Sequence, residues 1–407
     1  MPLTNGADYV IMNNPSEERN VLKVKLMNKI AKVGTDVLSP NRYEVGTDLQ
    51  GEDAIMVRSA NLHETEFSPS LRAIARCGAG VNNIPLERCT KEGIVVFNTP
   101  GANANAVKEL AVAALVLASR DILGGVKWVE SLQGTENVAK AVEAGKSAFV
   151  GHELAGKTLG VIGLGAIGGM VANAAISLGM SVMGYDPYIT AKAAWSLAPS
   201  VRQASDYGDI FKHCDYITLH VPATPQTKGM INEKTIAKMK TGVRILNLAR
   251  ADLVDATAIK SALESGKVAC YVTDFPTDET AGVKGIIAIP HLGASTMESE
   301  DHCAVMAAQQ LDEFLTCGNI KNSVNFPNVG IPVFDKPRVC VMNKNVPNML
   351  SQITSVFSSQ NINIENLANG SKGEVAYTIV ETNERANEDI LQRLKDIDGV
   401  FGIRTFG

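Results

Sequence analysis

The sequence predicts an α/β protein in which a doubly wound, parallel-sheet domain interrupts a smaller α/β domain and is followed by a separate βαββαβ unit. Three observations predict it. A Gly-x-Gly-x-x-Gly run at residues 163–168 stands between an apolar segment and a helical pattern. Short apolar runs alternate with helical stretches on both sides of that run, as in parallel sheets. Pro327, Pro332 and Pro337 then break the pattern, and a new series begins.

The first segment is predicted to form a small parallel sheet. Short apolar runs at residues 9–12, 54–57, 73–76 and 95–98 predict strands, and residues 22–31 predict a helix or a turn. A long apolar helix is expected at residues 105–120.

The central segment is predicted to form a second parallel sheet. Its expected strands are residues 157–162, 181–185, 216–220, 244–248, 268–273 and 286–289, with helices such as 166–178, 232–238 and 255–265 between them. A helix at residues 298–315 leads to the proline-rich linker. Beyond it, the order of predicted elements at residues 338–407 is that of a ferredoxin-like split βαβ unit.

The glycine run has the context of a dinucleotide-binding motif. Gly163 allows the tight strand-to-helix turn, Gly165 allows a pyrophosphate to approach the backbone, and Gly168 allows helix and strand to pack closely. Free N–H groups at the start of the helix, at Ala166 and Ile167, suit phosphate binding.

Asp186 decides between the two nicotinamide dinucleotides. It ends the strand that follows the glycine-rich helix, where a carboxylate accepts both adenosine ribose hydroxyls. Its negative charge would repel a 2′-phosphate. We therefore expect NAD rather than NADP.

Composition narrows the functional class. The chain has 407 residues, a net charge of −5 and 45% hydrophobic residues, which fits a globular protein of two or three domains. No basic block or 18-residue apolar run occurs, so neither nucleic acid nor a membrane is an expected partner. The N-terminus lacks a signal pattern. The seven cysteines lack metal-ligand spacing, so we expect reduced thiols, no metal and a cytoplasmic location.

Three side chains at predicted strand ends form a candidate catalytic set. Arg250 can bind an α-carboxylate bidentately, and His291 can exchange a proton near neutral pH. Glu279 would orient His291 and raise its pKa, although the adjacent Asp278 is an alternative partner. A surface role for Arg250, a loop role for Glu279 and a turn role for His291 are the competing interpretations. Further cofactor contacts are expected from His220, Val221, Pro222, Ala249 and Gly293.

Two loops of the first sheet are candidate substrate sites. They contain arginines that could meet an additional anionic group on the substrate, and glycines that could present backbone N–H groups to a carboxylate. The competing interpretation is that both arginines are ordinary surface residues. The residues concerned are Arg58, Ser59, Arg76, Gly78, Gly80, Val81 and Asn82.

With these residues in place, the chain resembles the D-2-hydroxy acid dehydrogenase family. The motifs that carry the resemblance occur in the family's order at residues 163–168 with Asp186, 247–255, 274–279 and 290–296. The resemblance implies that Asp274 holds the nicotinamide carboxamide and that residues 76–83 form the substrate-carboxylate loop. Ala251 stands where the family usually has glycine, and the interval from Glu279 to His291 is short.

The C-terminal unit resembles an ACT domain, an amino-acid-sensing module. Residues 343–350 match the loop before its first helix, with Asn348 in place of the usual glycine. The resemblance implies an effector site for an amino acid, L-serine, at Asn343, Asn345 and Asn363. The alternative is a purely structural dimerisation module.

Together these inferences predict a Rossmann-type NAD-binding domain (residues 104–292) inserted in a flavodoxin-like substrate domain (1–103 and 293–330), followed by a ferredoxin-like ACT domain (337–407). The resemblance implies NAD-dependent oxidation of 3-phospho-D-glycerate to 3-phosphohydroxypyruvate. Exposed strand edges in the C-terminal sheet predict pairing between subunits, as a homodimer or homotetramer. A dehydrogenase for another D-2-hydroxy acid, or an NAD-sensing binding protein without catalysis, are the alternatives.

Overall fold

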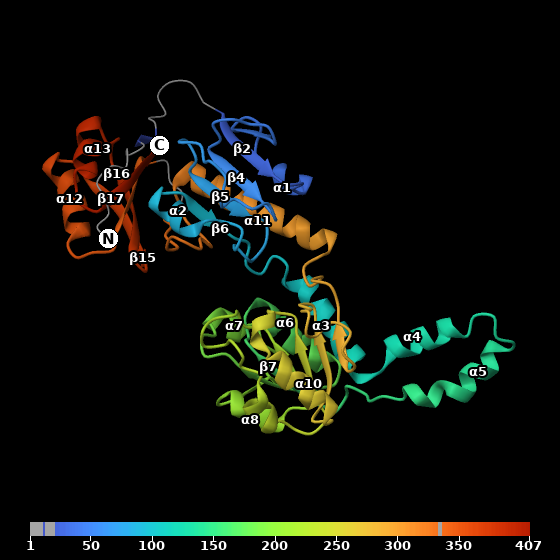
Figure 1. The fold of residues 1–407 in the computed structure, drawn as a ribbon. Helices are drawn as coiled ribbons and strands as arrows, with labels where there is room; N and C mark the ends of the chain where they lie inside the picture. The colour runs from blue at the N-terminus through green and yellow to red at the C-terminus, as the bar shows by residue number, and fades with distance from the viewer. Residues whose placement is uncertain (1–10, 13–20, 333–335) are drawn as a thin grey trace. The chain divides into compact units, whose positions relative to one another are not determined.

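The computed structural model describes residues 11–12, 21–332 and 336–407. It contains two compact units, Met1–Ala102 with Glu300–Gly407, and Asn103–Ser299. The predicted fold class is confirmed, because two parallel α/β sheets are accompanied by a third, mainly antiparallel sheet (Figure 1). The division into three domains stays a prediction. In the described residues, no helix is both long and apolar enough to cross a membrane.

The first unit contains a parallel sheet in the order β3-β2-β4-β5-β6, which is the flavodoxin-like order. Its core includes Phe97 and Phe314, whose rings meet edge to face at 5.6 Å. Its elements are β2 (Leu22–Met27), β3 (Tyr43–Gly46), β4 (Ala54–Val57), β5 (Ala73–Arg76), β6 (Val95–Phe97), α1 (Lys32–Thr35), α2 (Leu86–Lys91) and α11 (Met297–Cys317).

Two expectations for this sheet were wrong. The helix or turn predicted at residues 22–31 is strand β2 over its first six residues, and Val24 is fully buried between β3 and β4. The strand predicted at residues 9–12 lies partly outside the described residues. Its described part, β1 (Ile11–Met12), pairs in parallel with β17 (Val400–Phe406) of the C-terminal sheet and does not belong to the first one.

The second unit contains a seven-stranded parallel sheet in the order β13-β12-β11-β10-β7-β8-β9. The strand order reverses between β7 and β10, as in doubly wound dinucleotide-binding folds. The elements are β7 (Thr158–Ile162), β8 (Ser181–Tyr185), β9 (Arg202–Gln203), β10 (Tyr216–Leu219), β11 (Val243–Asn247), β12 (Val268–Thr273), β13 (Ile286–Ala288), α3 (Ala104–Ser119), α6 (Ala166–Ser177), α7 (Ala191–Trp195), α8 (Tyr207–His213), α9 (Glu233–Ala237) and α10 (Ala256–Glu264).

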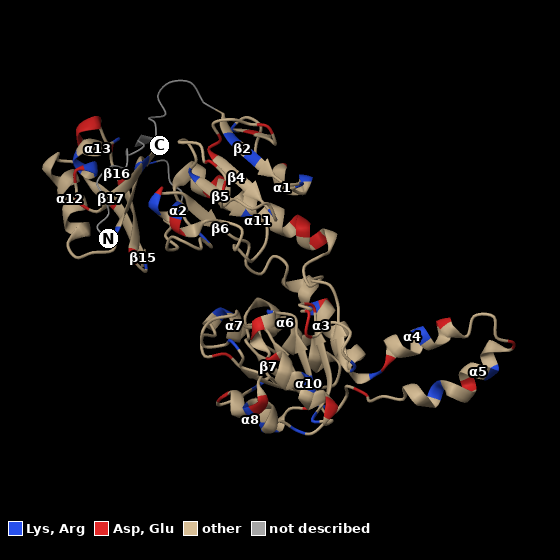
Figure 2. Cartoon of the chain, viewed as in Figure 1, with Lys and Arg blue, Asp and Glu red and all other residues tan. Residues whose placement is uncertain are grey.

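An arm of two helices, not anticipated from the sequence, extends from the second unit (Figure 1). It comprises α4 (Ile122–Ser131), α5 (Val138–Gly145) and the short 3-10 turn Lys146–Phe149. Neither helix has a buried residue, and Trp128 packs on Phe149 at 5.3 Å between ring centroids. Both signs of charge occur along the arm (Figure 2).

The C-terminal sheet has the order β1-β17-β14-β16-β15. Helices α12 (Met349–Ser359) and α13 (Glu388–Lys395) pack with strand residues such as Val341, Val380 and Ile403 in one cluster. Other side chains of β14 (Arg338–Lys344) and β16 (Val375–Thr382), including Met342 and Tyr377, share a core with Phe314 of α11. Strand β15 (Ile364–Lys372) is an edge. This sheet is therefore packed into the first unit.

Candidate active site

Several predicted site residues of the second unit follow the carboxyl ends of its parallel strands. Gly163 follows β7, Asp186 follows β8 and His220 follows β10. Arg250 comes shortly after β11, Asp274 directly follows β12, and His291 comes after β13. Carboxyl ends of parallel strands meet at one edge of a sheet, which is where open α/β sheets bind ligands.

The glycine-rich turn has the geometry that a dinucleotide requires. Gly163 has a φ of +90°, and a Cβ there would lie 2.6 Å from the carbonyl oxygen of His220. A Cβ on Gly168 would lie 1.9 Å from the carbonyl oxygen of Gly163, so helix α6 and the turn can approach only with glycine. A Cβ on Gly165 would meet nothing within 4 Å, which leaves the face at the start of α6 open. Ala166 and Ile167 form the first turn of α6.

Asp186 is fixed by the motif that it follows. Its carboxylate accepts hydrogen bonds from the backbone N–H of Leu164 (2.9 Å) and of Tyr188 (2.9 Å), one at each oxygen. Each oxygen retains a further lone pair for a hydroxyl group.

His220 and the residues after it line the turn. Val221 lies against Gly163, and the carbonyl of Pro222 accepts a hydrogen bond from the Thr227 hydroxyl (2.6 Å). Desolvation lowers the pKa of His220 to about 4, so this side chain is uncharged at neutral pH. An uncharged imidazole suits a pocket wall better than a proton relay.

Asp274 is the buried carboxylate of this unit. Its side chain is only 1% exposed, and burial raises its pKa against the opposing influence of the Gly293 N–H, His291 and Arg250. One oxygen accepts from the backbone N–H of Gly293 (3.1 Å), and the other is buried without a hydrogen-bond partner in the described structure. An unsatisfied buried acceptor at a strand end fits the nicotinamide carboxamide, whose NH2 group is a donor.

Arg250 and His291 are brought together by Phe275, which the sequence did not single out. The guanidinium of Arg250 lies 5.6 Å from the centroid of the Phe275 ring, and the His291 ring lies 4.4 Å from it. Buried Asn247 accepts from the N–H of Ala249 and of Arg250 and donates to the Arg250 carbonyl, so it fixes this turn.

The backbone at Ala251 does not need a glycine in this fold. It begins a short 3-10 turn, Ala251–Leu253, and is absent from the described residues with positive φ. The atypical alanine therefore carries no left-handed strain.

Glu279 is engaged elsewhere than at His291. Its side chain is 59% exposed and pairs with Lys260 at 3.5 Å. The charge of His291 acts on Asp274, whose pKa it lowers against the effect of burial. The choice of Glu279 or Asp278 as the partner of His291 stays a prediction, and Asp274 now stands beside them.

The two predicted arginines of the first unit lie at adjacent strand ends. In the parallel register of β4 and β5, Val57 pairs with Arg76, so Arg58 follows directly beside it. The positive charges of both arginines act on the thiol of Cys77, whose pKa burial nevertheless raises to about 12. The structure thus brings two cations to one edge of the sheet.

The loop that carries Arg58 and Ser59 is held by Asn28, a residue that sequence reasoning missed. The Asn28 side-chain oxygen accepts hydrogen bonds from three successive N–H groups, those of Arg58 (3.2 Å), Ser59 (3.0 Å) and Ala60 (3.0 Å). Asn28 itself has a φ of +114°, a conformation that asparagine adopts more readily than most residues.

The second loop depends on Gly78. Its φ is +146°, and a Cβ there would lie 1.4 Å from Nη1 of Arg76 and 2.5 Å from its Cζ. The Arg76 guanidinium therefore lies directly over this glycine. Further along the loop, Gly80 and Val81 are half-buried and Asn82 is exposed.

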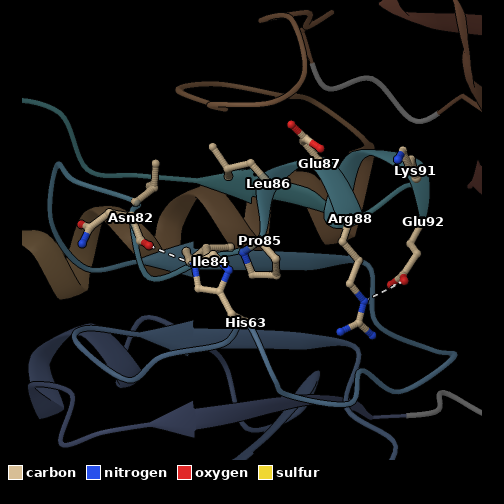
Figure 3. A pocket seen from close by; sticks show the side chains of 10 residues that line it. His63, Asn82, Ile84, Pro85, Leu86, Glu87, Arg88, Lys91 and Glu92 are labelled. Carbon is tan, nitrogen blue, oxygen red and sulfur yellow. Dashed lines mark hydrogen bonds and ion pairs between the residues drawn. The ribbon is translucent and has the colours of Figure 1, made fainter. Parts of the chain in front are cut away.

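A cavity of about 770 Å³ is lined by Val81 and Asn82 of this loop and by other residues, including His63 (Figure 3). His63 Nε2 lies 3.0 Å from the Asn82 carbonyl oxygen, which anchors the loop. Arg88, at the cavity's other side, pairs with Glu92.

The predicted effector residues lie at the ends of C-terminal strands. Asn343 is 1% exposed, and its side-chain oxygen is buried without a partner in the described structure. Asn345 donates to the carbonyl of Gly373 (3.1 Å), and the Asn363 N–H donates to the Asn383 side chain (3.0 Å). Asn348 has a φ of +70°, the left-handed conformation that a glycine would otherwise supply.

Comparison with known proteins agrees with this geometry. Residues 114–293 match the model of the D-isomer specific 2-hydroxyacid dehydrogenase NAD-binding domain, and residues 340–402 match the model of the acetohydroxyacid synthase small-subunit-like ACT domain. A D-3-phosphoglycerate dehydrogenase of Haemophilus influenzae is 31% identical over 352 residues, which cover 84% of this chain and 82% of that protein. The chain belongs to the D-isomer-specific 2-hydroxyacid dehydrogenase family, and its central segment is an NAD-binding domain.

Other relatives are matched in part. A D-3-phosphoglycerate dehydrogenase of Methanocaldococcus jannaschii is 34% identical over 75% of this chain, but the chain spans only 58% of its length. The crystal structure of an NAD+-bound 3-phosphoglycerate dehydrogenase of Entamoeba histolytica superimposes with a TM-score of 0.58 at 27% identity, covering 75% of this chain and 98% of that one.

Proposed function

We propose that this protein oxidises 3-phospho-D-glycerate to 3-phosphohydroxypyruvate with NAD, the first step of serine synthesis. The observation that carries the choice of a phosphorylated substrate is the pair of cations, Arg58 and Arg76, at adjacent strand ends. Several relatives named D-3-phosphoglycerate dehydrogenase support it.

Each side chain then has a chemical task. Arg250 binds the α-carboxylate and polarises the neighbouring oxygen, because its charge is permanent and its donors are planar. His291 accepts the proton of the C2 hydroxyl, and Phe275 holds both groups against one ring. The unsatisfied oxygen of Asp274 orients the carboxamide of the cofactor. Bound NAD supplies the hydride acceptor.

The first unit supplies the groups that distinguish one 2-hydroxy acid from another. Arg58 and Arg76 bind the phosphate, and the N–H groups of the loop at residues 78–82 bind the carboxylate. A spectrophotometric assay of NADH formation from NAD and 3-phospho-D-glycerate tests the assignment. Turnover of a different D-2-hydroxy acid alone would shift the assignment to that substrate, and no turnover of any 2-hydroxy acid would leave a binding protein.

We also propose that L-serine acts as an effector at the C-terminal unit, through Asn343, Asn345 and Asn363. The match to an ACT domain model supports a small-molecule role, and the unpartnered oxygen of Asn343 offers a buried acceptor. Adding serine to the same assay tests this role, and unchanged rates would favour a structural module.

We further propose a homodimer or homotetramer in the cytoplasm. The arm supports self-association, because it exposes Ile122, Leu123, Val126 and Val129, and so does the edge strand β15. All seven cysteines are free thiols and buried, which fits a reducing compartment. Light scattering of the purified chain gives the oligomeric state.

A further inference from the structure

One of the two arginines proposed to bind phosphate already has an acidic partner. Nη2 of Arg58 lies 2.6 Å from a carboxylate oxygen of Glu300, and the two side chains are 41% and 42% exposed. Both residues belong to the first unit. The ion pair is therefore accessible to a small ligand and can be exchanged for one.

The partners come from different elements, each with its own anchor. The Arg58 backbone is held by the Asn28 side chain, and Glu300 lies in the first turn of α11, where acidic residues gather (Figure 2). Acidic residues in a first turn stabilise a helix. Glu298 has that position and charge as well, but among the described residues only Glu300 pairs with Arg58.

We propose that Glu300 is a specificity-determining residue that opposes a doubly charged group at Arg58. This inference rests on the proposed function, in which Arg58 meets the substrate phosphate. A phosphate monoester carries a charge of about −1.5 to −2 at pH 7. To reach Arg58 it must displace the Glu300 carboxylate or lie next to it, and both cost binding energy. A substrate with an uncharged group at that position meets no such opposition.

The physical consequence is a penalty that depends on the charge of the substrate. Removing the Glu300 charge should lower KM for 3-phospho-D-glycerate by about two- to fivefold, the upper part of the range for exposed charge pairs. KM for D-glycerate, which lacks the phosphate, should change less than twofold. Since Glu300 is not proposed to touch the reacting atoms, kcat should stay near the wild-type value for both substrates.

The test uses the full chain and NADH formation at saturating NAD. Glu300→Gln keeps the shape of the side chain and removes its charge, and Glu298→Gln, in the same turn, is the matched control. We expect the lower KM for 3-phospho-D-glycerate in Glu300→Gln only, and we expect it to vanish when Arg58→Gln is combined with it. Thermal unfolding of each variant is measured to check that the substitution in helix α11 leaves the protein folded.

The outcomes separate the two claims. If wild-type protein does not oxidise 3-phospho-D-glycerate, the proposed function fails and this inference fails with it, before any variant is compared. If wild-type protein does oxidise it but Glu300→Gln leaves its KM unchanged or raises it, only the inference is overturned. A fall in KM of the same size for D-glycerate, or in Glu298→Gln, would also overturn it.

Discussion

Replacing Gly78 by alanine should displace Arg76 without unfolding the protein. The new Cβ would lie 1.4 Å from Nη1 of Arg76, and this steric clash means that one of the two groups must move. The guanidinium is the far end of a flexible side chain, so it moves while the backbone of the sheet keeps its place. A φ of +146° adds strain of about 1–3 kcal/mol for any residue with a Cβ.

The effect on activity follows from the charge that is displaced. Hydrogen bonds to a charged group contribute about 1.5–3 kcal/mol, and 1.36 kcal/mol corresponds to a tenfold change in rate. If Arg76 binds the phosphate, kcat/KM for 3-phospho-D-glycerate should fall by about ten- to a hundredfold. The loss should appear mainly in KM, because Arg76 is not expected to touch the reacting atoms.

Gly51→Ala is the matched control. Gly51 lies in the same unit with a φ of +66°, and a Cβ there would meet nothing within 4 Å. It should lower the melting temperature through strain alone and leave kcat/KM near the wild-type value. The assay is initial-rate kinetics with thermal unfolding of both variants. Wild-type kcat/KM in Gly78→Ala, or equal losses of activity in the two variants, would refute the reasoning.

Four further predictions concern other parts of the chain. Asp274→Asn should raise the melting temperature at pH 7, because the raised pKa of Asp274 means that its ionisation opposes folding. The free energy of unfolding of the wild type should therefore fall as pH rises from about 4. A difference in melting temperature between the two proteins that stays constant from pH 4 to 8 would contradict this. Phe275→Leu should lower kcat about two- to fivefold, because Arg250 and His291 lose their contacts with the ring. Phe275→Tyr, which keeps a ring, should recover the wild-type kcat. Equal kcat in the wild type and both variants would argue against a positioning role for Phe275. Asp186→Ala should raise the Kd for NAD about tenfold or more in a direct titration, and a wild-type preference for NADP would show that the charge argument is wrong. Arg338→Met should lower the free energy of unfolding, measured in urea, by about 3–5 kcal/mol, because Arg338 is 2% exposed and pairs at 2.6 Å with fully buried Glu381. The double variant Arg338→Met, Glu381→Leu should lose less stability. An equal loss of stability in both variants would mean that the ion pair is not the cause.

The sequence predicts best those features that local geometry determines. The glycine run, Asp186 and the residues that follow β11, β12 and β13 could be placed because a strand, a turn and a helix of fixed order bring them to one edge. Residues 22–31 failed for a local reason too. Leu22, Leu26 and Ile30 have helical spacing, whereas Leu22, Val24 and Leu26 alternate with lysines as in a strand. The burial of Val24 decides between the two periods.

The arm formed by α4 and α5 could not be anticipated, because both helices are short and neither buries a side chain. Asn28 and Phe275 escaped notice for another reason. Asn28 acts on residues 58–60, far along the chain, and Phe275 is an apolar residue among charged candidates. Contacts between distant segments leave no local pattern.

The charge of a residue alone does not predict its role in the candidate site, because the structure shows ion-pair partners that the sequence does not reveal. The sequence predicts Glu279 as a partner of His291, and in the structure its side chain is 59% exposed and pairs with Lys260. The sequence predicts Arg58 as a cation for phosphate, and in the structure Glu300 lies 2.6 Å from it. Asp274, which the resemblance implies holds the cofactor, is buried, and the charges of His291 and Arg250 lower its pKa against the effect of burial. Interactions between charges are stronger where burial lowers the effective dielectric constant. The electrostatics at the carboxyl edge of the second sheet therefore depend more on Asp274 than on the exposed Glu279.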